Sequence, residues 1–357
     1  MIMQRPALDN TSSHLLHMAQ KTQDAKSCHA STMAAHESLH WWANTAKTFS
    51  LLRRASTKGG HRTLLMIGDS TVRNQFAALC IVLGAQVVSQ PTKLGMECIC
   101  RGSLDRLRLQ VAFVYSMGAV LVPPHDVLNN QNRRMKSMLR AWQLAPPSAV
   151  YIGVGLWLQW PVPFQSAMDW TAHQDWLNYE QDLGRTLDHF SAVPQIVLMT
   201  THSQCQHQYR GDWAKATSPY SRGKWIAGCG DILLARTSKE AISSKRAGHA
   251  ATQSRILAYA DCRDGLRGRN GSARLNERLV SLLARREELA TKQNPPGIVA
   301  TQSVREPRIT LLDAFKMTDG RCSFNYPGDA MHFLGLIFDE VAELLHLLKW
   351  VRSDPGE

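Results

Sequence analysis

An apolar run that ends in Gly-Asp-Ser and continues as an amphipathic segment constrains the fold of this chain more than any other feature. The run Thr63–Ile67 predicts a buried strand, and Thr71–Leu83 repeats apolar residues at helical spacing. Gly68, Asp69 and Ser70 form the turn between them. We therefore expect Ser70 at the N-terminus of a helix, where the helix dipole and free backbone N–H groups favour an anion beside its hydroxyl.

Apolar runs and amphipathic segments alternate along the rest of the chain. Further strands are predicted at Gln86–Ser89, Leu107–Tyr115, Ala149–Gly155, Gln195–Thr200 and Arg308–Asp313. Further helices are predicted at Ala34–Ala55, Asn132–Trp142, Thr171–Phe190, Ile232–Tyr259, Ala273–Lys292 and Leu334–Val351. This alternation predicts an α/β fold with a mostly parallel sheet covered on both faces, whose functional residues lie at the carboxyl ends of the strands.

The length of the chain fits one large domain with insertions. Its 357 residues, 44% of them hydrophobic, are enough to bury a large core. We predict one domain over residues 34–351, with loop insertions at about 202–231 and 260–307. Residues 1–33 are polar and are expected to be disordered or loosely packed, and residues 352–357 form a tail.

The excess of basic residues leaves several partner classes open. The chain carries 41 Lys and Arg against 29 Asp and Glu, a formal net charge of +12. That charge suits nucleic acid, an anionic membrane surface or an acidic polysaccharide, but the basic residues are scattered and a solvated surface explains them equally well. Because no nucleic-acid recognition motif is present, we expect no nucleic-acid partner. The densest cluster, Arg263–Arg274, contains glycines and is typical of a flexible loop.

The cysteines and the hydropathy give weaker constraints. None of the eight cysteines forms a paired C-x-x-C motif, so we expect no metal site. Disulfides are the alternative, and Cys205 with Cys229 is the pair to test first. No run of about 18 apolar residues is present, so we expect no transmembrane segment. No signal or anchor is visible in Met1–Gln20, which taken alone leaves a cytoplasmic location open.

A serine hydroxyl needs a base, and that base needs a carboxylate, before the serine becomes a nucleophile. Asp329 and His332 supply both groups within one turn, directly before the last predicted helix. We predict Ser70 as nucleophile, His332 as general base and Asp329 as the acid that orients the imidazole. Two simpler interpretations stay open: Asp69 or Ser70 only caps the helix, and with fourteen histidines a D-x-x-H match arises by chance.

Three segments resemble a known enzyme family. Gly68–Gln75 resembles the G-D-S-x-x-R-N-Q signature of the PC-esterase group, a GDSL/SGNH-like family that includes plant trichome-birefringence-like polysaccharide O-acetyltransferases. Asp329–Leu334 is similar to the D-x-x-H-W element of that family, and Val197–Ser203 with His207 is similar to its strand and following loop. The resemblance implies a three-layer α/β/α sandwich of the SGNH-hydrolase type, in which Ser70 forms a covalent acyl-serine.

The resemblance also implies residues for the oxyanion hole and for substrate binding. These candidates are Gly68, Asp69, Arg73, Asn74, Gly155, Trp157 and His202. The family's asparagine-containing block is replaced here by Gly153–Trp157, which holds no asparagine. The donors would therefore come from other groups: the N–H of Ser70, the N–H of Gly95 or Gly155, and the side chain of Arg73 or Asn74. The tryptophans of the predicted loops suit stacking on sugar rings.

The implied activity is the transfer of an acyl group, usually acetyl, to or from a carbohydrate hydroxyl. The implied partner is a glycan substrate, and no cofactor is implied beyond an acetyl donor such as acetyl-CoA or an acetylated intermediate. The family usually works in the Golgi lumen or outside the cell. The alternative is a catalytically inactive glycan-binding protein of the same fold. Hydrolase and transferase share the acyl-serine, so both activities stay open.

Overall fold

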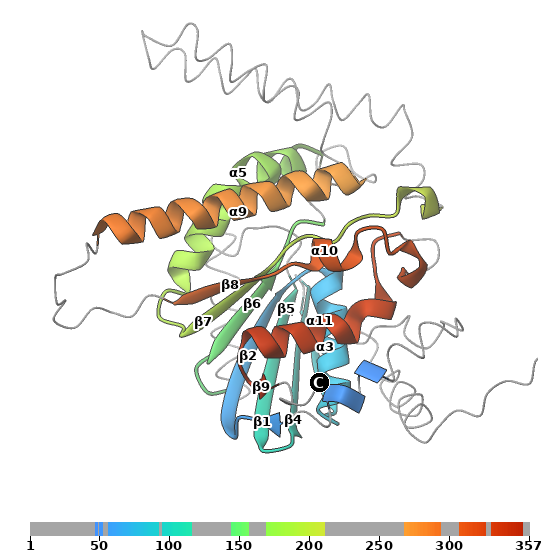
Figure 1. Ribbon diagram of the computed structural model, residues 1–357, viewed down its shortest axis with the longest axis vertical. Coiled ribbons are helices and arrows are strands. Elements are labelled where there is room, and N and C mark those ends of the chain that lie inside the picture. The colour runs from blue at the N-terminus through green and yellow to red at the C-terminus, as the bar shows by residue number, and fades with distance from the viewer. Residues whose placement is uncertain are drawn as a thin grey trace, which may run out of the picture.

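A seven-stranded, mostly parallel β-sheet forms the centre of the protein, seen here in a computed structural model (Figure 1). The structure describes residues 47–48, 50–52, 56–92, 95–115, 144–156, 169–210, 268–293, 307–325 and 330–352. The strands of the sheet are β2 (Gly60–Gly68), β3 (Val87–Thr92), β4 (Gly95–Leu104), β5 (Leu107–Tyr115), β6 (Ala149–Gly153), β7 (Gln195–Met199) and β8 (Arg308–Leu312). The predicted α/β class with a mostly parallel sheet is confirmed.

Helices follow β2, β6, β7 and β8 along the described part of the chain. They are α3 (Ser70–Val82), α5 (Asp169–His189), α9 (Gly268–Gln293), α10 (Ala314–Thr318) and α11 (Ile337–Leu347). Short 3-10 turns are η3 (Gln206–Gln208), η4 (Cys322–Phe324) and η5 (Leu334–Leu336). A separate two-stranded pairing joins β1 (Ser56–Thr57) and β9 (Val351–Arg352).

The sheet combines a parallel body with an antiparallel edge. Its spatial order is β3-β4-β5-β2-β6-β7-β8, in which β5, β2, β6, β7 and β8 run parallel while β3 and β4 pair antiparallel. Strand β2 is central, and its last residue, Gly68, pairs with Tyr115 on one side and Gly153 on the other. The carboxyl ends of these strands therefore meet at the edge of the sheet where Ser70 follows.

Strand β4 is the part of the sheet that the sequence pattern did not reveal. Its residues mix buried Cys98 and Cys100 with Arg101 and two glycines, so the strand holds no continuous apolar run. Its conformation depends on its pairing with β3 and β5. Side-chain packing against neighbouring strands, which an isolated sequence window does not contain, decides such a strand.

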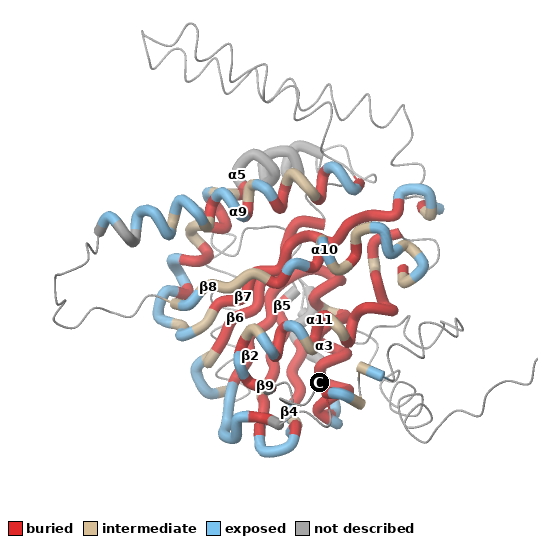
Figure 2. The backbone as a smooth tube through the Cα atoms, in the orientation of Figure 1, coloured by how far each residue is buried: buried red, intermediate tan, exposed pale blue. Residues whose placement is uncertain are grey.

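Alternate residues of β2 face two separate hydrophobic cores. Leu64 and Met66 pack with residues of α3 and α11, whereas Leu65 and Ile67 pack with residues of α5 and α9. This division follows from the two-residue repeat of a β-strand. Because both faces are covered there, the strand is continuously apolar from Leu64 to Ile67. Figure 2 shows the carboxyl-terminal half of β2 and the strands β6 and β7 largely buried, whereas much of α9 is exposed.

Helix α9 begins earlier than the sequence pattern predicts. The expectation of a flexible loop over Arg263–Arg274 is wrong for its described part, because residues 268–274 form the first turns of α9. These turns are held by packing: Ser272 is fully buried and Leu275 enters the second core. Arg269 also pairs with Asp319, at 2.7 Å from its Nε to the nearer carboxylate oxygen.

The last predicted helix, Leu334–Val351, is shorter in the structure. Residues Leu334–Leu336 form η5, and α11 ends at Leu347. Lys349 then adopts a left-handed backbone conformation (φ 56°), and Val351 pairs with Thr57. The chain therefore leaves the helix to join β1, a pairing that helical spacing in the sequence does not indicate.

Two disulfides whose cysteines both lie among the described residues join segments that are separate in the sequence. Cys80–Cys100 joins α3 to β4, and Cys205–Cys322 joins the loop after β7 to η4. The predicted pair of Cys205 with Cys229 is therefore wrong. The true partner lies 117 residues away along the chain, and only the packing of the sheet edge brings the two sulfurs together.

Several predicted features lie outside the described residues. They are the segment 1–33, most of the helix Ala34–Ala55, the helices Asn132–Trp142 and Ile232–Tyr259, and residues 211–231 of the first insertion.

Gly68 is predicted to be required by the close approach of β2 to β6. A Cβ at this position would lie 2.2 Å from the Gly153 carbonyl oxygen and 2.4 Å from Val72 Cγ2. Gly68→Ala should therefore lower the free energy of unfolding by about 1–3 kcal/mol in urea titrations. The control is Gly184→Ala on α5, where the new methyl meets nothing closer than 4.0 Å. This control should raise stability by about 0.5–1 kcal/mol; equal effects of both substitutions would contradict the packing argument.

Candidate active site

Ser70 is the first residue of α3, directly after the turn that ends β2. Asp69 caps this helix, since its Oδ1 accepts the Thr71 N–H at 2.8 Å. The Ser70 N–H lies in the first helical turn, where an α-helix provides no acceptor of its own. The predicted strand, turn and helix around Ser70 are confirmed. The cap shows that one simpler interpretation, Asp69 as an N-cap, is also correct.

Ser70 and His332 are brought together across most of the chain. The Ser70 Oγ lies 2.7 Å from His332 Nε2, although 262 residues separate them in the sequence. When the imidazole carries its proton on Nδ1, the Ser70 hydroxyl donates to Nε2, which is the contact that a general base needs. The serine is 8% exposed and His332 is partly exposed, so the pair lies at the surface edge of the buried sheet.

The predicted third member of the triad, Asp329, lies outside the described residues, as does Trp157. The described chain resumes at Ala330, which is fully buried and has a left-handed backbone conformation (φ 60°). Such a conformation is uncommon for a residue with a Cβ and persists where the surrounding structure holds it. Its carbonyl accepts the Cys205 N–H at 2.9 Å, so the segment that leads to His332 is held from the loop after β7.

Asp69 places a carboxyl group beside the two histidines of the site. Burial raises the pKa of Asp69 above 3.8, and the Thr71 N–H and the imidazoles of His332 and His202 oppose this shift. The residue is 2% exposed. Asp69 was predicted near the oxyanion hole, and the structure gives it a cap role and an electrostatic contact with His332.

The other predicted oxyanion residues lie close to the same sheet edge. Gly155 follows β6 with φ 145°, and a Cβ there would lie 2.1 Å from Thr201 Oγ1, so only glycine fits. Asn74 is 4% exposed, and its Oδ1 is buried without a hydrogen-bond partner. Arg73 is half-buried, and its backbone N–H bonds to the Asp69 carbonyl at 3.0 Å.

His202 lies beneath the site and forms a buried ion pair. Its Nε2 lies 2.8 Å from Glu340 Oε1, and the side chains are 3% and 1% exposed. Burial disfavours the imidazolium, but the carboxylates of Glu340 and Asp69 and the backbone of Met331 outweigh it, so the pKa of His202 is raised above 6.5. This burial favours a supporting role for His202 over the predicted contact with substrate.

Glu340, Gln75 and Tyr151 complete a polar network that the sequence analysis missed. Gln75 Nε2 donates to Glu340 Oε2 at 2.6 Å, and Tyr151 OH donates to Gln75 Oε1 at 2.8 Å. Burial, followed by the Glu340 carboxylate, raises the pKa of Tyr151 well above 10, so the phenol stays a neutral donor. The sequence held one signal: Glu340 and Gln75 each occupy a position on the apolar face of an amphipathic helix.

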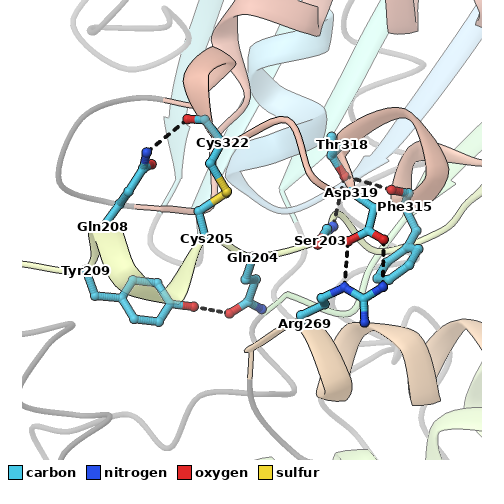
Figure 3. Close-up of a disulfide and its surroundings, with 10 residues drawn as sticks. All are labelled: Ser203, Gln204, Cys205, Gln208, Tyr209, Arg269, Phe315, Thr318, Asp319 and Cys322. Atoms are coloured by element: carbon cyan, nitrogen blue, oxygen red, sulfur yellow. Dashed lines mark hydrogen bonds and ion pairs between the residues drawn. A yellow bond between two sulfur atoms is a disulfide. The ribbon is translucent and has the colours of Figure 1, made fainter.

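The loop that carries His202 is fixed on both sides (Figure 3). Ser203 donates its hydroxyl to Asp319 at 3.0 Å, and its N–H bonds to Thr318 Oγ1 at 2.9 Å. Asp319 is in turn held by Arg269, whose hydrogen bonds lower the pKa of Asp319 below 3.8. With the Cys205–Cys322 disulfide, these contacts tie the loop after β7 to α9, α10 and η4.

Among the described residues, no group of three or more His, Cys, Asp or Glu side chains is arranged to hold a metal ion. None of the helices in the described part of the chain is both long and apolar enough to cross a membrane.

The raised pKa of His202 predicts a pH-dependent contribution to stability. A folded-state pKa above the unfolded value of 6.5 means that this contribution is complete below pH 6.5 and is lost as the pH rises through the folded value. The stability difference between the wild-type protein and His202→Gln should therefore shrink with rising pH. Urea titrations between about pH 5 and pH 9 measure it; a difference that grows with pH would contradict the ion-pair assignment.

The chain matches no family model, no curated protein and no solved structure. The interpretation of the site therefore depends on its own chemistry. A serine hydroxyl at the N-terminus of a helix lies in hydrogen-bond contact with an imidazole.

Proposed function

We propose that this protein is a serine-dependent acyltransferase or esterase. The observation that carries the proposal is the 2.7 Å contact between Ser70 Oγ and His332 Nε2, formed by the first residue of α3. A solvated serine needs no such partner, whereas a nucleophilic serine needs a neutral imidazole within hydrogen-bond reach. The position at the carboxyl end of a central parallel strand is also where α/β sheets bind their ligands.

In the proposed reaction, Ser70 Oγ attacks the carbonyl carbon of an ester as His332 Nε2 takes the hydroxyl proton. The tetrahedral intermediate then expels the alkoxide, which receives that proton from His332, and an acyl-serine remains. In the second half, His332 takes a proton from water or from a sugar hydroxyl, whose oxygen attacks the acyl-serine. Ser70 leaves with the proton, and the product is a free acid or a new ester.

The oxyanion of each intermediate requires nearby hydrogen-bond donors. The Ser70 N–H in the first turn of α3 is one candidate, and the Gly155 N–H at the end of the neighbouring strand is a second. The helix dipole of α3 favours negative charge at the same point. Asp329 is proposed as the carboxylate that orients His332 and stabilises its charged form.

We infer a glycan as the substrate, acetyl as the acyl group and an SGNH-like three-layer arrangement as the fold. Support for the fold comes from helices that share cores with both faces of the sheet. The substrate class rests on the resemblance in Gly68–Gln75 and Asp329–Leu334. An acetyl donor such as acetyl-CoA or an acetylated intermediate would supply the group. The two disulfides support an oxidising compartment such as the Golgi lumen or the cell exterior.

Ser70→Ala and His332→Ala are each expected to lower the hydrolysis of a chromogenic acetyl ester by about a thousandfold or more, because both groups act in one step. A fluorophosphonate probe should label the wild-type protein at Ser70. Incubation with an activated acetyl donor, followed by mass spectrometry, should place the acetyl group on the same residue.

The matched control is Ser103→Ala, which removes an exposed hydroxyl on β4. Its ester hydrolysis and labelling should equal those of the wild type. Full activity in Ser70→Ala or in His332→Ala would end the proposal. Absence of labelling together with retained glycan binding would instead support the inactive glycan-binding alternative.

A further inference from the structure

We propose that the buried pair of His202 and Glu340 positions both halves of the Ser70–His332 dyad, a role that rests on the proposed acyl transfer. The two halves come from distant parts of the chain: Ser70 begins α3, whereas His332 precedes η5 and α11. Catalysis by two residues from such distant segments requires that the segments be held in a fixed position relative to one another. A displacement of about 1 Å can cost about a hundredfold in rate.

On the side of the general base, His202 contacts both sequence neighbours of His332. Its ring packs edge-on against Phe333, with ring centroids 5.6 Å apart and an interplanar angle of 87°. The backbone of Met331 interacts with the same ring. The direction of the His332 side chain therefore depends on where the His202 ring lies.

On the side of the nucleophile, Glu340 reaches the helix of Ser70. Its Oε2 accepts from Gln75 Nε2 at 2.6 Å, and Gln75 lies about one and a half turns after Ser70 on α3. Tyr151 donates to the other end of the same amide at 2.8 Å, and it pairs with Met66 on β2. Two hydrogen bonds thus link β6 to α3 and α3 to α11, and the ion pair of Glu340 extends this series of contacts to His202.

The chemistry of this series favours positioning over bulk stability. All four side chains of the network are nearly fully buried: Gln75, Tyr151, His202 and Glu340. A buried ion pair often stabilises a protein no better than apolar residues of the same volume would. It does fix geometry, since each donor and acceptor must stay paired in a medium where an unpaired charge is costly. Glu340 faces a partner at each oxygen: Oε2 accepts from Gln75, and Oε1 lies beside the His202 imidazole.

Three variants test the role. Glu340→Gln removes the charge and keeps the shape, His202→Gln with Glu340→Gln removes both charges together, and Tyr151→Phe deletes only the hydroxyl at the end of the series. For each, kcat and KM on a chromogenic acetyl ester and the rate of fluorophosphonate labelling at Ser70 are measured per folded molecule. We expect kcat and labelling to fall about tenfold to a hundredfold in the first two and severalfold in Tyr151→Phe, with KM within about twofold.

The control is Leu183→Ala, which opens a cavity in the core on the opposite face of the sheet. It should lower the melting temperature and leave kcat and labelling unchanged, which separates positioning from general destabilisation. Wild-type kcat in the Glu340→Gln protein, in the double variant and in Tyr151→Phe would overturn the positioning role. If the wild-type protein itself is not labelled at Ser70, the proposed function fails, which is a distinct result.

Discussion

The hydrogen bond between Ser70 and His332 depends on one constraint, the parallel run of β5, β2, β6, β7 and β8. Because these strands point the same way, the segments that follow them meet at one edge of the sheet. Ser70 follows the central strand, His202 follows β7, and the segment of His332 comes after β8 and α10. Residues that are hundreds of positions apart become neighbours there without any long-range signal in the sequence.

The edge of the sheet is then fixed by three kinds of contact that act on the same loops. A disulfide joins Cys205 to η4, a backbone bond joins Cys205 to Ala330, and Ser203 bonds to α10. Beneath them lies the His202–Glu340 ion pair, whose charges are stabilised because each has a partner. The left-handed backbone of Ala330 shows that this surrounding structure imposes a local conformation rather than only accepting one.

The electrostatic properties of the site result from the burial of ionisable side chains next to groups of opposite charge. Asp69, Glu340 and His202 bring acidic and basic groups of opposite charge into a region from which water is mostly excluded. Burial raises the pKa of Asp69, and the nearby carboxylates raise that of His202. A positive charge that forms on His332 during the proposed acyl transfer would therefore arise near the carboxyl group of Asp69.

The sequence by itself determined most of the local elements and predicted that Ser70 and His332 would be partners. An apolar run, a Gly-Asp-Ser turn and helical spacing were enough to place Ser70 at the start of α3, and the alternation of such units was enough for a mostly parallel sheet. Only the tertiary structure decided the partner of Cys205, the strand β4 and the pairing of His202 with Glu340. The physical reason is the separation along the sequence of the residues that interact. Helical and strand periodicity depend on residues that are close in the sequence, whereas these contacts depend on which surfaces pack together.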